Sequence, residues 1–203
     1  MPIAINGSGT ITGLSTGGLP DGSIVAADLA SGAITAGALP TGSILQVKQT
    51  HLNTADSQAL TASTRAEISN LSVSITPVSS TSDMLIFVRW AGESSAANSY
   101  DSVFGIRRDS TDIGNPATAG NRQVGIASLS QGFWNSNADS TPDTTSYWFL
   151  DQTRSSGTSQ ITYKATIDVV DPQTLYNQRT VGDGDIDSTE RLTSTMIVME
   201  VAA

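Results

Sequence analysis

Apolar and polar residues alternate along many short stretches of the longer, C-terminal part of the chain, as they do in half-buried β-strands. In residues 160–169, Ile161 and Tyr163 fall on one side, whereas Thr162 and Lys164 fall on the other. Strands are predicted at residues 43–50, 71–75, 83–90, 102–108, 122–127, 146–150, 160–169, 174–181 and 193–201. About eight or nine strands with turn signals between them predict an all-β, jelly-roll-like sandwich of two sheets.

Two regions of this part are less regular. Residues 56–70 contain enough Ala, Leu and Ile for a short helix, but we favour a strand followed by an extended loop. Residues 135–145 are rich in Ser, Asn, Asp and Pro, which predicts an exposed loop.

The first 47 residues follow a different pattern. They hold half of the chain's 18 glycines and only two charged side chains, Asp21 and Asp28. The sequence of residues 19–24 returns almost unchanged at residues 39–44, which indicates a repeated structural unit. Each copy is predicted to be a turn, because its proline fixes φ and its glycine accepts positive φ.

Short aliphatic pieces lie between these turns, and none is long enough to bury itself within one chain. We predict that identical chains bury each other's Ile and Leu side chains, or that the segment inserts into another protein. A disordered linker is the alternative, although such linkers are usually poor in Ile, Leu and Val. The predicted oligomerisation and attachment residues are Ile11, Leu14, Leu19, Ile24, Leu29, Ile34, Leu39 and Ile44. The predicted organisation is an extended Gly-rich repeat segment over residues 1–45 and a β-sandwich domain over residues 46–203.

Charge and composition narrow the function classes. The formal charge of −9 repels nucleic-acid phosphates, so we expect no nucleic-acid partner. The absence of cysteine excludes disulfides, thiol nucleophiles and thiolate metal sites. No apolar run approaches the roughly 20 residues of a membrane span, so no membrane insertion is expected. The first residues lack the basic and apolar pattern of a signal peptide, which favours export inside a particle or by lysis.

Four motifs occur in a characteristic order along the chain. Leu-Pro-Thr-Gly-Ser-Ile-Leu-Gln-Val occupies residues 39–47, Leu-Ser-Val-Ser-Ile-Thr-Pro residues 71–77, Thr-Ser-Asp-Met-Leu-Ile residues 81–86, and Met-Ile-Val-Met-Glu-Val-Ala-Ala residues 196–203. This order resembles the short fibre and tail-appendage proteins of phages that infect aquatic bacteria, notably cyanophages. The resemblance implies a trimeric β-sandwich of general C1q-like or receptor-binding-tip shape, carried on an N-terminal attachment segment.

The function implied by this resemblance is structural and non-enzymatic. We expect a homotrimer located in the virion, attached by its N-terminus to other proteins of the tail or capsid and presenting the sandwich to a host-surface glycan. A capsid decoration or head-fibre protein is the alternative within this class. A polysaccharide hydrolase and a secreted lectin-like adhesin are the alternatives from other classes.

An acidic loop is the strongest candidate for cation binding. Asp183, Asp185 and Asp187 alternate within residues 182–190, and Ca²⁺ prefers oxygen ligands of this kind. The spacing departs from that of an EF-hand, so the alternative is a solvated hairpin loop whose charges block edge pairing. No other cofactor is expected.

Aromatic residues are candidates for glycan contact. Trp134 lies in a predicted loop beside Asn135 and Asn137, where an aromatic ring and amides would bind a sugar. Trp90 and Trp148 lie in apolar strands and are predicted to be in the core or at a subunit interface.

Catalytic groups are scarce. His51 is the only histidine, and no nucleophile-elbow pattern surrounds any serine, so no Ser-His-Asp triad is predicted. Glycoside hydrolysis needs two carboxyl groups on rigid elements. Asp168 and Glu200 lie in predicted strands, but we expect both on the polar face, and we predict no catalytic residue.

Overall fold

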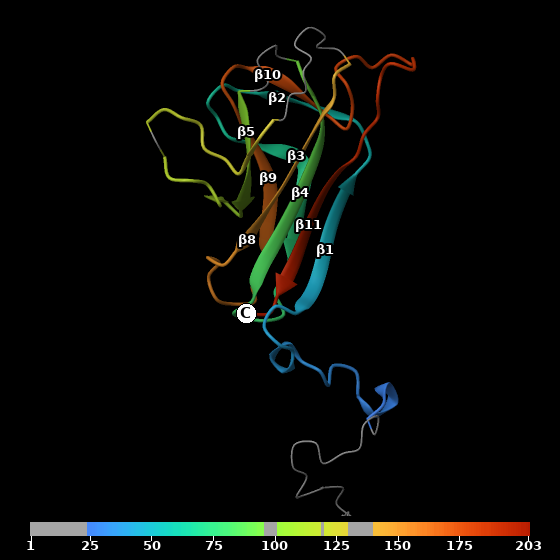
Figure 1. The fold of residues 1–203 in the computed structure, drawn as a ribbon, viewed down its shortest axis with the longest axis vertical. Coiled ribbons are helices and arrows are strands. Elements are labelled where there is room, and N and C mark those ends of the chain that lie inside the picture. Colours follow the sequence, from blue (N-terminus) through green and yellow to red (C-terminus); the bar gives the residue numbers. More distant parts are fainter. Residues whose placement is uncertain (1–23, 96–100, 119, 130–139) are drawn as a thin grey trace, which may run out of the picture. The chain divides into compact units, whose positions relative to one another are not determined.

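The chain divides into two compact units, Met1–Leu39 and Pro40–Ala203. The structure, a computed structural model (Figure 1), describes residues 24–95, 101–118, 120–129 and 140–203. Near the start of the second unit, Gly42 N donates to Ala202 O at 2.7 Å and Ala202 N donates to Ser43 O at 2.9 Å. These bonds tie the entry to the first strand to the sandwich.

The second unit is built from antiparallel strands in two sheets, which confirms the predicted all-β, two-sheet class. Among the described residues the strands are β1 (Ile44–Leu52), β2 (Asp56–Leu60), β3 (Ala66–Ile75), β4 (Asp83–Ser94), β5 (Ser102–Arg108), β6 (Thr111–Ile113), β7 (Ala127–Ser128), β8 (Asp143–Asp151), β9 (Ile161–Val169), β10 (Gln173–Asn177) and β11 (Ser194–Val201).

Sheet A places the long strand β4 at its centre (Figure 1). One edge of β4 pairs with β11, which in turn pairs with β1, and the other edge pairs with β8. Gly92 pairs with both Asn177 of β10 and Asp143 of β8, so β10 and its neighbour β2 continue the sheet beyond the end of β11. Sheet B has the order β3-β9-β5-β6, with β7 also paired to β5.

The core lies between the two sheets and follows the alternation of the sequence. Trp90 is fully buried, and its ring packs 5.3 Å from that of Phe104, which lies 6.1 Å from that of Tyr147. The polar atoms of these rings are satisfied internally, since Trp90 Nε1 donates to Asn177 Oδ1 and Tyr147 Oη to Gly105 O. A buried aromatic cluster of this size gives the sandwich one well-defined packing.

Of three local predictions of secondary structure, one is confirmed and two are corrected. Residues 56–70 form β2 and the start of β3, so the favoured strand interpretation is confirmed over the helix. Residues 122–127 were expected to form a strand, but only Ala127–Ser128 is paired with β5, and Val124 O accepts a hydrogen bond from the Arg65 guanidinium instead of joining a ladder. The predicted loop over residues 135–145 is also too long, because β8 begins at Asp143.

Candidate functional site

The described part of the N-terminal segment consists of two successive ten-residue units. Short 3₁₀ helices, η1 (Ala26–Asp28) and η2 (Ala36–Ala38), occupy the same place in each unit. Turns follow both helices at equivalent positions, over residues 31–32 and 41–42. The sequence repeats after twenty residues, whereas the backbone pattern repeats after ten. One sequence repeat therefore spans two backbone units.

Main-chain hydrogen bonds recur with the same spacing. Asp28 N donates to Val25 O and Ala38 N donates to Thr35 O, each at 2.9 Å. The first of these loops is also closed by the Asp28 carboxylate, which accepts from Val25 N at 2.9 Å.

The turns of the two units also match. Ala33 N donates to Ala30 O at 2.9 Å, and Ser43 N donates to Pro40 O at 3.1 Å. Gly32 and Gly42 occupy the same turn position with φ values of 78° and 89°, a region that residues with a side chain rarely adopt. Glycine is therefore required once in every ten residues.

Each ten-residue unit exposes one isoleucine and one leucine. The exposed fractions are Ile24 55%, Leu29 44%, Ile34 55% and Leu39 38%, followed by Ile44 48% at the start of β1. Their spacing of five residues continues back in the sequence to Leu19 and Leu14. Ile11, Leu14 and Leu19 lie outside the described residues. The described members of the predicted oligomerisation set thus remain uncovered by their own chain.

The acidic loop does not gather its carboxylates into a ligand cluster. Asp183 forms ion pairs with Arg179, at 2.6 Å, and with Arg191. Asp185 and Asp187 are exposed. Within the described residues no group of three or more His, Cys, Asp or Glu side chains is placed to hold a metal ion. The predicted Ca²⁺ site has no preformed ligand set there, because arginines already neutralise Asp183.

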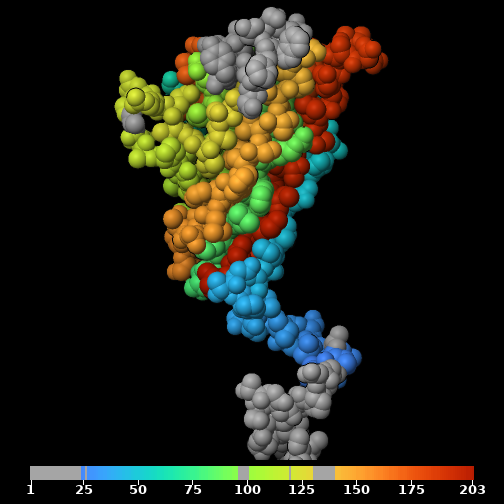
Figure 2. Space-filling view, in the orientation of Figure 1, coloured from blue at the N-terminus to red at the C-terminus, as the bar shows by residue number. Residues whose placement is uncertain are grey.

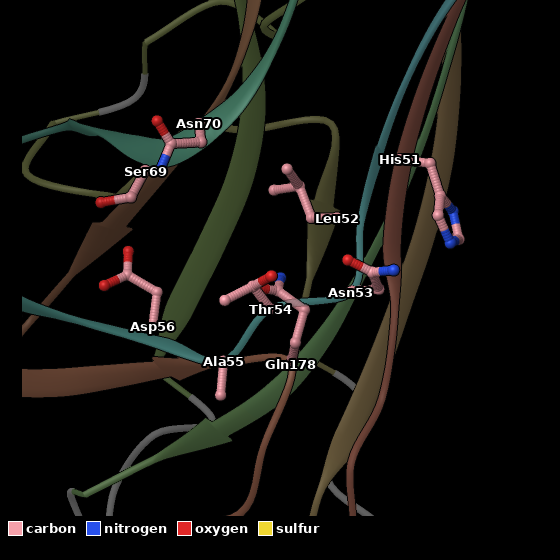
Figure 3. A pocket seen from close by; sticks show the side chains of 9 residues that line it. All are labelled: His51, Leu52, Asn53, Thr54, Ala55, Asp56, Ser69, Asn70 and Gln178. Atoms are coloured by element: carbon pink, nitrogen blue, oxygen red, sulfur yellow. The ribbon is translucent and has the colours of Figure 1, made fainter.

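His51 lies at the margin of a hollow of about 400 Å³ between the end of β1 and the bend of β3 (Figure 3). Its Nδ1 lies 3.0 Å from Thr195 Oγ1. Figure 3 shows the imidazole at the opposite end of the hollow from Asp56. The hollow therefore does not present the imidazole together with a carboxylate.

A pair of carboxylates lies at the start of β8. Burial, together with the charge of Glu93, raises the pKa of Asp143 from 3.8 to about 6. Glu93 is itself buried and accepts hydrogen bonds from the amide and hydroxyl of Thr141 and from Val181 N. Because Glu93 is engaged by its own fold, the pair does not offer two free carboxyl groups to a sugar.

Two comparisons with known proteins were informative. No protein-family model matches the chain, and no curated protein matches it. The resemblance to phage appendage proteins stays a prediction. In the part of the chain that the structure describes, no helix has the length and apolar character needed to cross a membrane.

The predicted aromatic sites have different outcomes. Trp90 was expected in the core or at a subunit interface, and it lies in the core. Trp148 is not in the core: it is 65% exposed on the outer face of β8, with its ring 6.3 Å from that of Phe87. Trp134, Asn135 and Asn137 lie outside the described residues.

The prediction for Glu200 is wrong. Its carboxylate is 0% exposed, because Glu200 alternates in phase with the buried residues Met196 and Val198. It accepts hydrogen bonds from Gln46 Nε2, Ser82 Oγ and the main-chain amides of residues 78 and 79. Glu200 thus fastens the loop between β3 and β4 to β11, and its position in the alternation was the signal that sequence reasoning missed.

A second buried carboxylate has a similar role. Asp151 is 0% exposed and accepts hydrogen bonds from Arg108, at 2.8 Å, and from Tyr163 Oη, at 2.8 Å. Burial alone would raise the pKa of Asp151, but these hydrogen bonds hold it below its ordinary value. The carboxylates of Asp151 and Glu200 are therefore both engaged in hydrogen bonds that hold the fold together.

Proposed function

We propose that the chain is a structural protein of a phage particle, a trimeric tail fibre or appendage that attaches by its N-terminal segment and presents its β-sandwich to a host surface. The single observation that carries the proposal is the pair of ten-residue units with uncovered isoleucine and leucine. A unit of ten residues cannot bury these side chains by itself, whereas neighbouring copies of the same unit can.

An assembly with closed rotational symmetry is the simplest way to bury the exposed isoleucine and leucine side chains of such a segment. Each copy presents the same aliphatic positions at the same spacing, so identical chains placed side by side bury matching residues all along their length. Three chains are proposed because the sequence motifs resemble trimeric appendage proteins.

We propose that the sandwich is of the jelly-roll type. The strand orders β1-β11-β4-β8 and β3-β9-β5-β7 support this, because successive strands of the chain cross repeatedly from one sheet to the other. Such a domain presents connecting loops at its ends.

The assembly is tested by the mass of the full chain in solution. Sedimentation equilibrium is expected to give three times 21.0 kDa. The double variant Ile34→Ser/Leu39→Ser should weaken the trimer, whereas Ala27→Ser, a substitution at another exposed position of the same segment, should leave it intact. A stable monomer at every concentration would refute the proposed assembly.

The location is tested by gold-labelled antibody on intact particles under the electron microscope. Label at the tail supports the fibre proposal, and label spread over the shell favours a capsid decoration protein. If particles of a phage whose genome encodes the chain carry no label, the proposed location in the virion is refuted.

A further inference from the structure

The outer face of sheet A carries two adjacent rows of apolar side chains. In one row Trp148, Phe87 and Ile197 lie opposite one another on β8, β4 and β11. In the next row Leu150, Leu85, Met199 and Val47 lie opposite one another on β8, β4, β11 and β1. Gln49, beside Ile197, is the one polar residue in these rows. The seven apolar residues are called the apolar face.

The rows lie across four strands that stand side by side on one side of the molecule (Figure 2). Trp148, Val47, Leu150 and Phe87 are exposed. At one end of the rows the outer positions become polar or charged, at Arg89 and His51. At the other end the next row begins with Asp83 on β4 and continues with the apolar residues Val201 and Ile44, so the rim is charged there only at β4. An apolar centre with a polar rim is the usual anatomy of a protein interface.

The outer face of sheet B has the opposite character. Lys164 Nζ lies 2.9 Å from Glu67 Oε1, and Arg107 Nε lies 2.8 Å from Asp112 Oδ1. Arg107 also reaches Glu67. Water solvates such a charged network well, whereas it solvates exposed apolar side chains poorly. Sheet A is therefore the sheet whose outer face gains from burial against a partner.

We propose that the apolar face is the contact between sandwich domains of neighbouring copies of this chain. Charge favours this occupant. A chain with a formal charge of −9 repels its own copies over most of its surface, whereas the apolar face has no charged residue. Two copies therefore approach each other with least repulsion through this face.

The path of the chain also favours a second copy. The repeat segment leads directly into β1, whose Ile44 and Val47 are exposed on the edge strand of this same sheet. This part of the inference depends on the proposed function, because chains joined along their repeat segments hold their β1 strands at high effective concentration.

The size of the face explains why such a tether is needed. Strand spacing and residue rise give the rows an area of roughly 300 Å². A stable interface buries about 800 Å² on each partner, so the apolar face forms only the centre of the contact.

The test uses the full chain, whose lack of cysteine allows single-cysteine reporters. Gln49→Cys places a thiol within the rows without removing an apolar residue, and Ser74→Cys places one at an exposed position on the outer face of sheet B. In the assembled chain, iodoacetamide should alkylate the Gln49→Cys variant about tenfold more slowly than the Ser74→Cys variant, because an interface centre excludes water. The difference should disappear when dilution yields monomers.

Adding Trp148→Arg to the Gln49→Cys chain should restore rapid alkylation, with an unchanged far-UV circular dichroism spectrum and cooperative urea unfolding confirming that the sandwich remains folded. Equal rates for both reporters in a chain that sediments as an oligomer would overturn the interface and leave the proposed assembly standing. Protection that persists in monomers would mean that the chain covers its own face, and would also overturn the proposal. A chain that is monomeric throughout would refute both proposals.

Discussion

At the scale of single residues, the carboxylate of Glu200 is fully buried and accepts several hydrogen bonds. Burial alone would raise its pKa, but hydrogen bonds from Ser82, Gln46 and main-chain amides hold the pKa below the ordinary value of 4.5. A lowered folded-state pKa stabilises the protein above the unfolded pKa, and this stabilisation is lost as the pH falls through the folded value.

Replacing Glu200 by glutamine should therefore destabilise the fold. The new amide group would face main-chain N–H donors, and the unfolding free energy in urea at pH 7 should fall by about 2–3 kcal/mol. The difference from the unmodified chain should narrow as the pH is lowered below 4.5. Ser82→Ala removes one donor only and should cost less; an equal loss for both variants would contradict the assigned role of the carboxylate.

The pKa of Asp143 is shifted in the opposite direction to that of Glu200. Its raised pKa means that the folded state binds a proton more tightly than the unfolded chain, so stability falls as the pH rises from 3.8 to about 6. Asp143→Asn removes this penalty, and because the group is partly exposed to solvent the gain at pH 7 should be on the order of 1 kcal/mol.

The measurement for Asp143→Asn is thermal unfolding at several pH values. The gain in stability should vanish below pH 3.8, where the aspartate is protonated in both states. Asp187→Asn, in the exposed loop, controls for the loss of one negative charge. A gain that is independent of pH would show that burial and Glu93 do not act on Asp143 as described.

At the scale of elements, Gly92 marks the place where β4 passes from β11 to β10. A Cβ atom at this position would overlap the carbonyl oxygen of Tyr176 and press on the Trp90 ring. Gly92→Ala should therefore separate β10 and β2 from β4 and lower the unfolding free energy by about 1–3 kcal/mol.

Hydrogen exchange distinguishes this local effect from a general one. Amides of β10 and β2 should exchange faster in the variant, while those of β11 keep their protection. Gly37→Ala, where an added Cβ meets no atom within 4 Å, is the matched control. Uniform loss of protection across sheet A would contradict the local effect.

The elements also show how far sequence reasoning reaches. Alternation located most of the strands because one face of each is buried, as in residues 160–169, which became β9. It missed β6, which has three residues and too few positions to show a period. It placed Glu200 on the polar face because the side chain is charged. Glu200 nevertheless lies two positions after the buried Val198 and four after the buried Met196, so strand alternation places it inside.

The candidate sites were harder to predict for a different reason. The ion pair of Asp183 with Arg191 joins residues on the two sides of one loop, and the local sequence pattern does not reveal such a contact. The cross-strand rows of the apolar face depend on register between β8, β4, β11 and β1, which a single sequence does not reveal. The aliphatic residues of the repeat segment were found because their signal is periodic.

At the scale of the whole molecule, the formal charge of −9 opposes assembly while an uncharged contact favours it. Salt should therefore strengthen the association, because it screens repulsion between copies and weakens no ion pair across the apolar face. The dissociation constant from sedimentation should fall between 20 mM and 500 mM salt, by about tenfold for this charge. An association that weakens with salt would point to a contact made through charged residues.

The matching turns at Gly32 and Gly42 have one more consequence. Within residues 24–44, inserting or deleting ten residues would return isoleucine to an isoleucine position and leucine to a leucine position, whereas a change of five would exchange them. The segment is therefore a modular spacer, whose reach can be lengthened by duplication while the sandwich at its end is left untouched.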